Sequence, residues 1–134
     1  MEDKTGNGMK NVAIVRTLAS VSKKQSMAIV RFIKGKKVDD AVELLNNVVK
    51  KKIAIPMKGE IPHRKGMASG RYPVKASALF IKLLKSVAAN ASQKAIEGNL
   101  VISGKVNTAP KTLRPRRFRH HFKRAYIELR LEKK

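Results

Sequence analysis

One stretch of this chain lacks acidic residues altogether. Residues 98–127 contain no aspartate or glutamate. The same stretch carries eight lysines and arginines, namely Lys105, Lys111, Arg114, Arg116, Arg117, Arg119, Lys123 and Arg124. Repulsion between like charges destabilises a compact state unless a partner supplies charges of the opposite sign. The missing negative charge is therefore expected on a polyanionic partner.

Cysteine and long apolar runs are also missing. Without cysteine the chain can form neither disulfides nor thiolate zinc sites. Three histidines, His63, His120 and His121, do not by themselves make a convincing set of metal ligands, so we expect no metal and no cofactor. The first ten residues are polar, and no run approaches the ~18 apolar residues of a membrane span. These absences favour a soluble, intracellular protein.

Basic residues dominate the composition. The 134 residues include 31 Lys and Arg against 9 Asp and Glu, which gives a net charge of +22. Phosphate contacts by Lys and Arg supply affinity without any catalytic group, so nucleic acid is the favoured partner and a membrane surface the main competitor. At this length one domain over residues 1–134 is expected, with a flexible N-terminus at residues 1–11.

A first helix is predicted over residues 22–34. Ser22 and Gln25 have the spacing of a capping box, and Gly35 stands where a left-handed residue would end the helix. Apolar residues recur at helical spacing between these limits. Met27 is one of them and is expected in the core.

Two further helices follow from the same periodicity. The second is predicted over residues 38–49, with Asp39 and Asp40 in the first turn, where the helix dipole favours negative charge. The third starts with Pro73 as its first helical residue and ends near residues 91–94. Its apolar face is expected in the core.

Between the second and third helices the pattern breaks. Residues 50–72 contain two prolines, three glycines, seven basic residues and one acid, Glu60. Loops longer than about 12–15 residues are uncommon in compact domains unless they bind something. We therefore expect a long basic loop that extends along the partner.

The remaining segments predict strands. Residues 12–18 are rich in Val and Ile, and residues 127–131 alternate between apolar and charged side chains. Residues 127–131 are expected to pair antiparallel with residues 100–106. With Ile102 opposite Leu129, these two segments give a ribbon whose arms are about 40 Å long. The fold class expected is α+β, with a small antiparallel sheet packed on three helices and a long protruding basic β-hairpin over residues 100–131.

No catalytic arrangement accompanies these elements. There is no paired-carboxylate, serine-histidine or phosphate-loop pattern, so neither an enzyme nor a small-molecule substrate is expected. A merely solvated basic tail is the usual meaning of a charge run. The interleaved aromatics and the returning strand favour polyanion binding instead. A DNA-compacting chromatin-type protein is the alternative, and a membrane-surface protein ranks third.

Four motifs carry a more specific resemblance: IKGKKV at residues 33–38, GRYP at 70–73, SVAANA at 86–91 and VNTAPK at 106–111. Together they resemble the universal large-subunit ribosomal protein family numbered twenty-two, called seventeen in eukaryotes. The long loop before GRYP resembles the archaeal and eukaryotic branch, because bacterial members join these helices more directly. The connection between the APK motif and the returning strand is shorter here than is usual in that branch.

The resemblance implies a cytoplasmic protein of the large ribosomal subunit. Its partners would be large-subunit rRNA and neighbouring large-subunit proteins, with a hairpin threaded through rRNA to the wall of the nascent-peptide exit tunnel. The hairpin tip facing the tunnel, and through it the nascent peptide, would be Arg114, Pro115, Arg116 and Arg117. The rRNA-binding residues expected from the resemblance and from charge are Lys34, Lys36, Lys37, Arg64, Arg71, Tyr72, Lys111, Arg114, Arg116, Arg117, Arg119, His120, Lys123 and Arg124.

Overall fold

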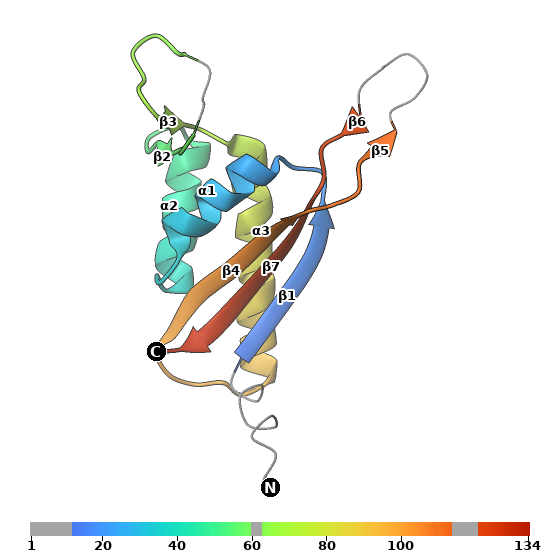
Figure 1. Ribbon diagram of the computed structural model, residues 1–134. Coiled ribbons are helices and arrows are strands. Elements are labelled where there is room, and N and C mark those ends of the chain that lie inside the picture. Colours follow the sequence, from blue (N-terminus) through green and yellow to red (C-terminus); the bar gives the residue numbers. More distant parts are fainter. Residues whose placement is uncertain (1–11, 60–62, 114–120) are drawn as a thin grey trace, which may run out of the picture.

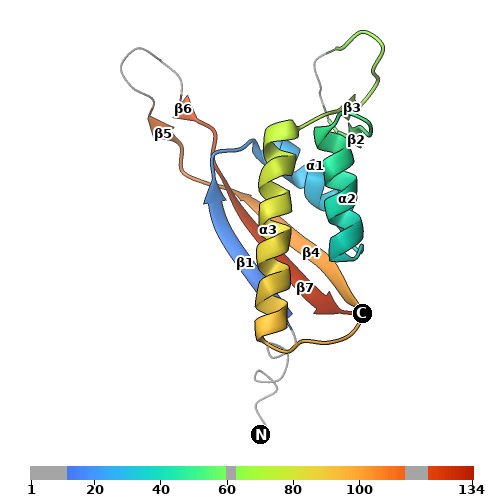
Figure 2. The same ribbon diagram turned by 180° about the vertical axis from the view of Figure 1, so that it is seen from behind.

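The computed structural model describes residues 12–59, 63–113 and 121–134, and in them three helices cover one face of a three-stranded antiparallel sheet (Figure 1). The expected α+β class, with a small sheet packed on three helices, is confirmed. Figure 2 shows the helical side, where α3 lies along the sheet beside α1 and α2. The flexible N-terminus expected at residues 1–11 lies outside the described residues.

The sheet has β7 at its centre. Its strands, in spatial order, are β1 (Val12–Ala19), β7 (Ala125–Lys133) and β4 (Leu100–Thr108). Both outer strands run antiparallel to β7. Ile127, Leu129 and Leu131 are buried, as their alternation predicts, and the residues between them face the other way. The sheet therefore has a core face under the helices and an outer face without helices.

The register between β4 and β7 differs from the predicted one by two residues. Ile102 lies opposite Leu131, and Leu129 lies opposite Gly104. A shift of two residues keeps every side chain on its own face, so alternation alone could not select the register. Packing selects it, because a Cβ on Gly104 would lie 2.9 Å from Leu129 Cδ2 and 3.3 Å from Val30 Cγ1. Glycine at this position leaves room for Leu129 and for α1.

The helices begin within one residue of their predicted starts. They are α1 (Lys23–Ile33), α2 (Val38–Val49) and α3 (Val74–Gln93). Pro73 precedes α3 as its N-cap and is not its first residue. Ser22 is the N-cap of α1, but its side chain makes no capping hydrogen bond, so the predicted capping box is wrong. Gly35 has the expected left-handed conformation, with φ +77°.

The core lies between the helices and the sheet. Its largest fully buried side chains include Phe80, Leu84, Val87, Ile29, Ile33, Leu45, Val48, Ile102, Ile127, Leu129 and Leu131. The apolar face of α3 is thus confirmed as core. Met27 is only half-buried, which corrects the prediction. The buried stripe of α1 runs through Ser26, Ile29 and Ile33, so Met27 lies at its edge.

The basic loop is more ordered at its base than the sequence suggested. Two short strands, β2 (Ile55–Pro56) and β3 (Gly70–Arg71), pair antiparallel inside residues 50–72. Ile55 is fully buried, and a Cβ on Gly70 would lie 3.0 Å from Ala54 Cβ. Two-residue strands are too short to show a period in sequence. The small ribbon fixes both ends of the loop to the domain.

Two segments project from the same end of the molecule. One is the loop between β2 and β3. The other is made by β5 (Thr112–Leu113) and β6 (His121–Phe122), which pair antiparallel. We call residues 109–113 and 121–124 the arm. Figures 1 and 2 show the loop and the arm at the same end of the molecule but on opposite sides of it, with the C-terminus at the other end.

Candidate nucleic-acid interface

The arm continues the β4 and β7 ribbon with one extra residue on the outgoing side. In the last pair of the sheet Thr108 faces Ala125, and in the first pair of the arm Thr112 faces Phe122. Three residues therefore lie opposite two between these pairs, which is the arrangement of a β-bulge. One of the three is Pro110, which has no N–H to donate. The bulge ends the regular sheet and bends the ribbon where it leaves the helices (Figure 1).

Exposed cations lie on both sides of the arm. Lys111 and Lys123, both predicted to bind rRNA, are exposed. Arg124 is half-buried, and its Nη1 donates a hydrogen bond to Thr112 Oγ1 at 2.8 Å, which joins the two sides of the arm. Phe122 leaves 39% of its surface exposed beside them. The described part of the arm thus combines positive charge with an accessible aromatic ring.

Six predicted residues of the hairpin fall outside the described part of the chain. They are Arg114, Pro115, Arg116, Arg117, Arg119 and His120. Their assignment to rRNA and to the tunnel-facing tip stays a prediction.

The predicted loop residues differ in what surrounds them. Arg64 is exposed. Arg71 is half-buried, and its Nη1 donates to the carbonyl oxygens of Gly70 at 2.7 Å and Ala68 at 3.4 Å. Tyr72 is half-buried directly before α3. Arg71 therefore helps to hold the returning side of the loop, whereas Arg64 presents its charge to solvent.

The predicted lysines between α1 and α2 lie apart from the arm. Lys34, Lys36 and Lys37 are exposed on a turn that is hydrogen-bonded to β4. The Gly35 N–H donates to the Ile102 carbonyl at 2.8 Å, and the Ile102 N–H donates to the Lys36 carbonyl at 3.0 Å. Six residues of β4 separate this point from the start of the arm, a distance of about 20 Å. The structure therefore presents two separate basic regions.

A hollow of about 710 Å³ lies where the arm meets the helices. The residues of its lining that bear on ligand chemistry are Gln25, Lys75, Lys111, His121, Phe122 and Lys123. Sequence reasoning assigned no binding role to Gln25 or Lys75. Their positions in the first turns of α1 and α3 were the available signal, but only the tertiary structure brings those turns to the arm.

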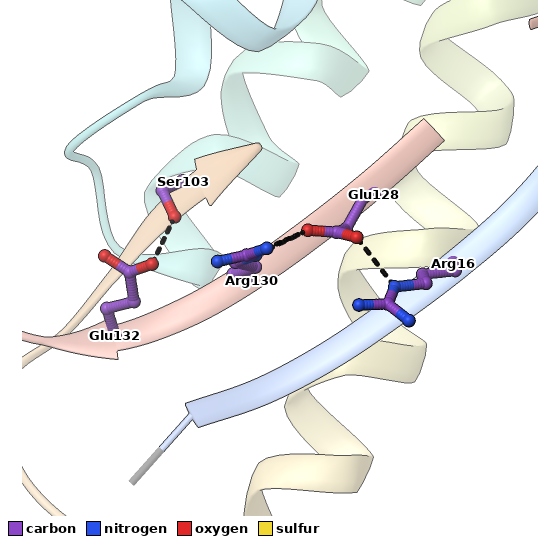
Figure 3. A network of polar contacts seen from close by, with 5 residues as sticks. All are labelled: Arg16, Ser103, Glu128, Arg130 and Glu132. Carbon is purple, nitrogen blue, oxygen red and sulfur yellow. Dashed lines mark hydrogen bonds and ion pairs between the residues drawn. The ribbon is translucent and has the colours of Figure 1, made fainter. Parts of the chain in front are cut away.

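The outer face of the sheet has a different character. Glu128 accepts hydrogen bonds from Arg16 Nε at 2.6 Å and from Arg130 at 2.5 Å, and the Ser103 hydroxyl donates to Glu132 at 2.9 Å (Figure 3). The hydrogen bond from Arg16, with help from Arg130, holds the pKa of Glu128 below its usual value, although partial burial acts in the opposite direction. Arg16 and Arg130 thus have an acidic partner within the protein on this face.

Apolar side chains adjoin this network. Leu18 is 38% exposed and Tyr126 is 47% exposed, and both line a second hollow of about 420 Å³ on the outer face. Arg16, Lys105 and Glu128 also line it. The sequence analysis did not identify this surface. The surface is formed by outward-facing residues of three strands, and the sequence shows which residues alternate in each strand. It does not show which strands are neighbours, so these residues could not be assembled into one surface.

The interface chemistry is that of hydrogen-bond donation to anions. In residues 12–59, 63–113 and 121–134, no three His, Asp or Glu side chains group in a way that could hold a metal ion. In the same residues, no helix is both long and apolar enough to cross a membrane. Exposed ammonium groups on the arm and on the α1–α2 turn can donate to phosphate oxygens.

Comparison with known proteins gives a consistent result. A family model described as "Ribosomal protein L22p/L17e" matches residues 14–130. The protein named "Large ribosomal subunit protein uL22" from Picrophilus torridus is 41% identical over 85 residues, covering 61% of this chain and 57% of the relative. Its namesake from Archaeoglobus fulgidus is 42% identical over 89 residues, covering 61% and 57%. The one from Ignicoccus hospitalis is 39% identical over 88 residues, covering 59% and 55%.

The chain therefore spans little more than half the length of these relatives. All three come from archaea, which agrees with the branch that the sequence motifs indicate.

Proposed function

Because the chain belongs to the ribosomal protein L22p/L17e family, we propose that it is a structural component of the large ribosomal subunit that binds large-subunit rRNA. The observation that carries this proposal is the arm. Its described strands are two residues long, and a ribbon of that kind is marginal in water. Lys111 and Lys123 are exposed on it, so RNA phosphates would neutralise the charge while RNA surface orders the ribbon.

The proposal extends to three rRNA contacts. The arm and the exposed Arg64 of the loop project from the same end and would enter neighbouring parts of the folded RNA. The turn that carries Lys34, Lys36 and Lys37 would bind a separate strand about 20 Å away. We further propose that the hairpin tip reaches the exit-tunnel wall and meets the nascent peptide. That step rests on the family resemblance alone.

Neighbouring ribosomal proteins are the proposed partners of the outer sheet face. This face carries Glu128 and Glu132 among its basic residues, and carboxylates are unfavourable against phosphates. Exposed Leu18 and Tyr126 supply apolar surface of the kind that protein interfaces bury. Folded RNA and protein would thus meet different faces of the same small domain.

The test is binding to a transcript of large-subunit rRNA at increasing salt. Replacing Lys111 and Lys123 by Ala should flatten the dependence of log K on log salt by roughly 0.7–0.9 per lost phosphate contact. The matched control replaces Lys82 and Lys85, which are exposed along α3, and so changes net charge by the same amount. Equal slopes for the two double variants would contradict the assignment of the arm.

The chromatin-type alternative is tested with the same protein. Duplex DNA of matched length should compete poorly against the large-subunit transcript, and the protein should co-sediment with large subunits from lysate. Equal competition by DNA, together with sedimentation away from ribosomes, would favour the alternative.

A further inference from the structure

The hollow at the base of the arm is formed by three segments that are distant in sequence. They are the connection from β1 into α1, the start of α3, and both sides of the arm. Its volume of about 710 Å³ falls within the range of roughly 300–1,000 Å³ typical of sites for small molecules and cofactors. A groove of that size can accept a side group of a larger polymer.

Three lysines give the hollow its charge. Lys75 comes from α3, while Lys111 and Lys123 come from opposite sides of the arm. None of the three has an acidic partner among the described residues, and no acid occurs among the described residues of the lining. The site therefore matches an anionic group that can lie between these cations.

Two helix N-termini add to the same field. α1 and α3 both begin at the hollow, and neither has an acidic residue in its first turn or a side-chain cap. The first N–H groups of a helix have no partner within the helix, and its dipole makes this end positive. α2 behaves differently, because Asp39 and Asp40 occupy its first turn. The uncompensated N-termini are the two at the hollow.

An aromatic ring completes the chemistry. Phe122 lines the hollow and is 39% exposed, next to the exposed His121. An aromatic ring would not contribute to the binding of a simple phosphate ion. It does suit an unstacked base, since bases stack on aromatic side chains while lysines bind the adjoining backbone.

From these features we infer that the hollow holds one unstacked nucleotide of the bound RNA, with its base on Phe122 and its phosphates beside Lys75, Lys111 and Lys123. The inference rests on the proposed rRNA binding and adds a specific nucleotide site to it. It also gives the α1 and α3 N-termini a role, because they complete the positive surface around the flanking phosphates.

The test compares two exposed aromatic residues on the same returning segment. Phe122→Leu removes the ring at the hollow, and Tyr126→Leu removes one from the outer sheet face. Phe122→Leu should weaken binding to the large-subunit transcript by about 5- to 100-fold, in line with the loss of one stacked base. Tyr126→Leu should change it less than about twofold. Chemical probing of the complex should show one unpaired nucleotide that loses protection with Phe122→Leu only.

The second part of the test compares two lysines of α3. Lys75→Ala should flatten the salt dependence by roughly 0.7–0.9 per contact, whereas Lys82→Ala, two turns further along α3 and outside the lining of the hollow, should not. Circular dichroism should be unchanged in all four variants, because each side chain is partly or fully exposed.

If Phe122→Leu and Tyr126→Leu both bound the transcript with wild-type affinity and gave the wild-type probing pattern, the nucleotide site would be overturned. The proposed function would then still stand. Equal slopes for the two lysine variants would overturn the phosphate placement at Lys75. Failure of the wild-type protein to bind the transcript at all would overturn the proposed function itself.

Discussion

The two halves of one β-ribbon have opposite surroundings. In the half formed by β4 and β7, Ile102, Leu129 and Leu131 are buried under the helices, and Glu128 pairs with Arg16 and Arg130 on the outer face. In the half formed by β5 and β6, the side chains of residues 112, 121 and 122 are all exposed and the segment has no acid. One bulge separates the halves.

This difference indicates where each half obtains its stability. The domain half is stabilised by burial of apolar area, which the protein supplies itself. Among the residues of the arm whose side chains the structure describes, only Ala109, at its base, is buried, and the arm carries uncompensated charge, so we expect its order to depend on an external polyanion. Variants in the two halves should therefore affect different measurements.

The largest expected effect is on the domain half. Leu129→Ala removes a fully buried side chain from the central strand and should lower the free energy of unfolding by about 2–5 kcal/mol. Urea denaturation of the free protein measures this loss. Lys123→Ala in the arm is the control, and it should stay within about 0.5 kcal/mol of the parent. Equal losses would show that the arm belongs to the core's cooperative unit.

The next effect concerns the register of the domain half. Gly104→Ala places a Cβ 2.9 Å from Leu129 Cδ2 and 3.0 Å from the Glu128 carbonyl oxygen, and should destabilise by about 1–3 kcal/mol. Asn107→Ala, on the exposed outer face of the same strand, serves as the control. A neutral Gly104→Ala in thermal unfolding would contradict the packing that selects this register.

On RNA binding, in contrast to stability, substitutions in the arm should have larger effects than substitutions in the domain half. Lys105 and Lys111 are exposed lysines on the same outgoing segment, one in each half. Lys111→Ala should reduce the salt slope of rRNA binding by roughly 0.7–0.9, whereas Lys105→Ala, beside Glu128, should leave it unchanged. A larger change in the salt slope for Lys105→Ala than for Lys111→Ala would place RNA on the sheet face and contradict the assigned roles of the two halves.

The smallest effect is electrostatic. Because the pKa of Glu128 is lowered in the folded protein, its contribution is present above the unfolded pKa of about 4.5 and is lost as pH falls through the folded pKa. Glu128→Gln should lower stability at pH 7 by up to about 1 kcal/mol per pair with Arg16 and Arg130. The difference from the parent should vanish in acid. A constant difference down to pH 2 would exclude this ion-pair origin.

Local patterns predicted much of the domain. The bounds of α2, the left-handed Gly35 and the alternation in β7 all follow from spacing, because each depends on residues close in sequence. The register did not, since a two-residue slip leaves the alternation intact. The pairing of Arg16 with Glu128 joins residues 112 apart, and no local rule could find it.

The candidate interface was predictable in part. Charge alone drew attention to Lys111, Lys123 and Arg124, and the structure describes all three on the arm. The hollow required three distant segments to meet, so Lys75 carried no special meaning in the sequence.

The central claim is that the arm gains its order from rRNA while the domain is stable alone. Amide hydrogen exchange in the free protein and in purified large subunits tests it most directly. The account predicts that β5 and β6 amides exchange near the unfolded-chain rate in the free protein and become protected in the subunit, while β7 amides are protected in both. Arm amides protected as well as those of β7 in the free protein would contradict it.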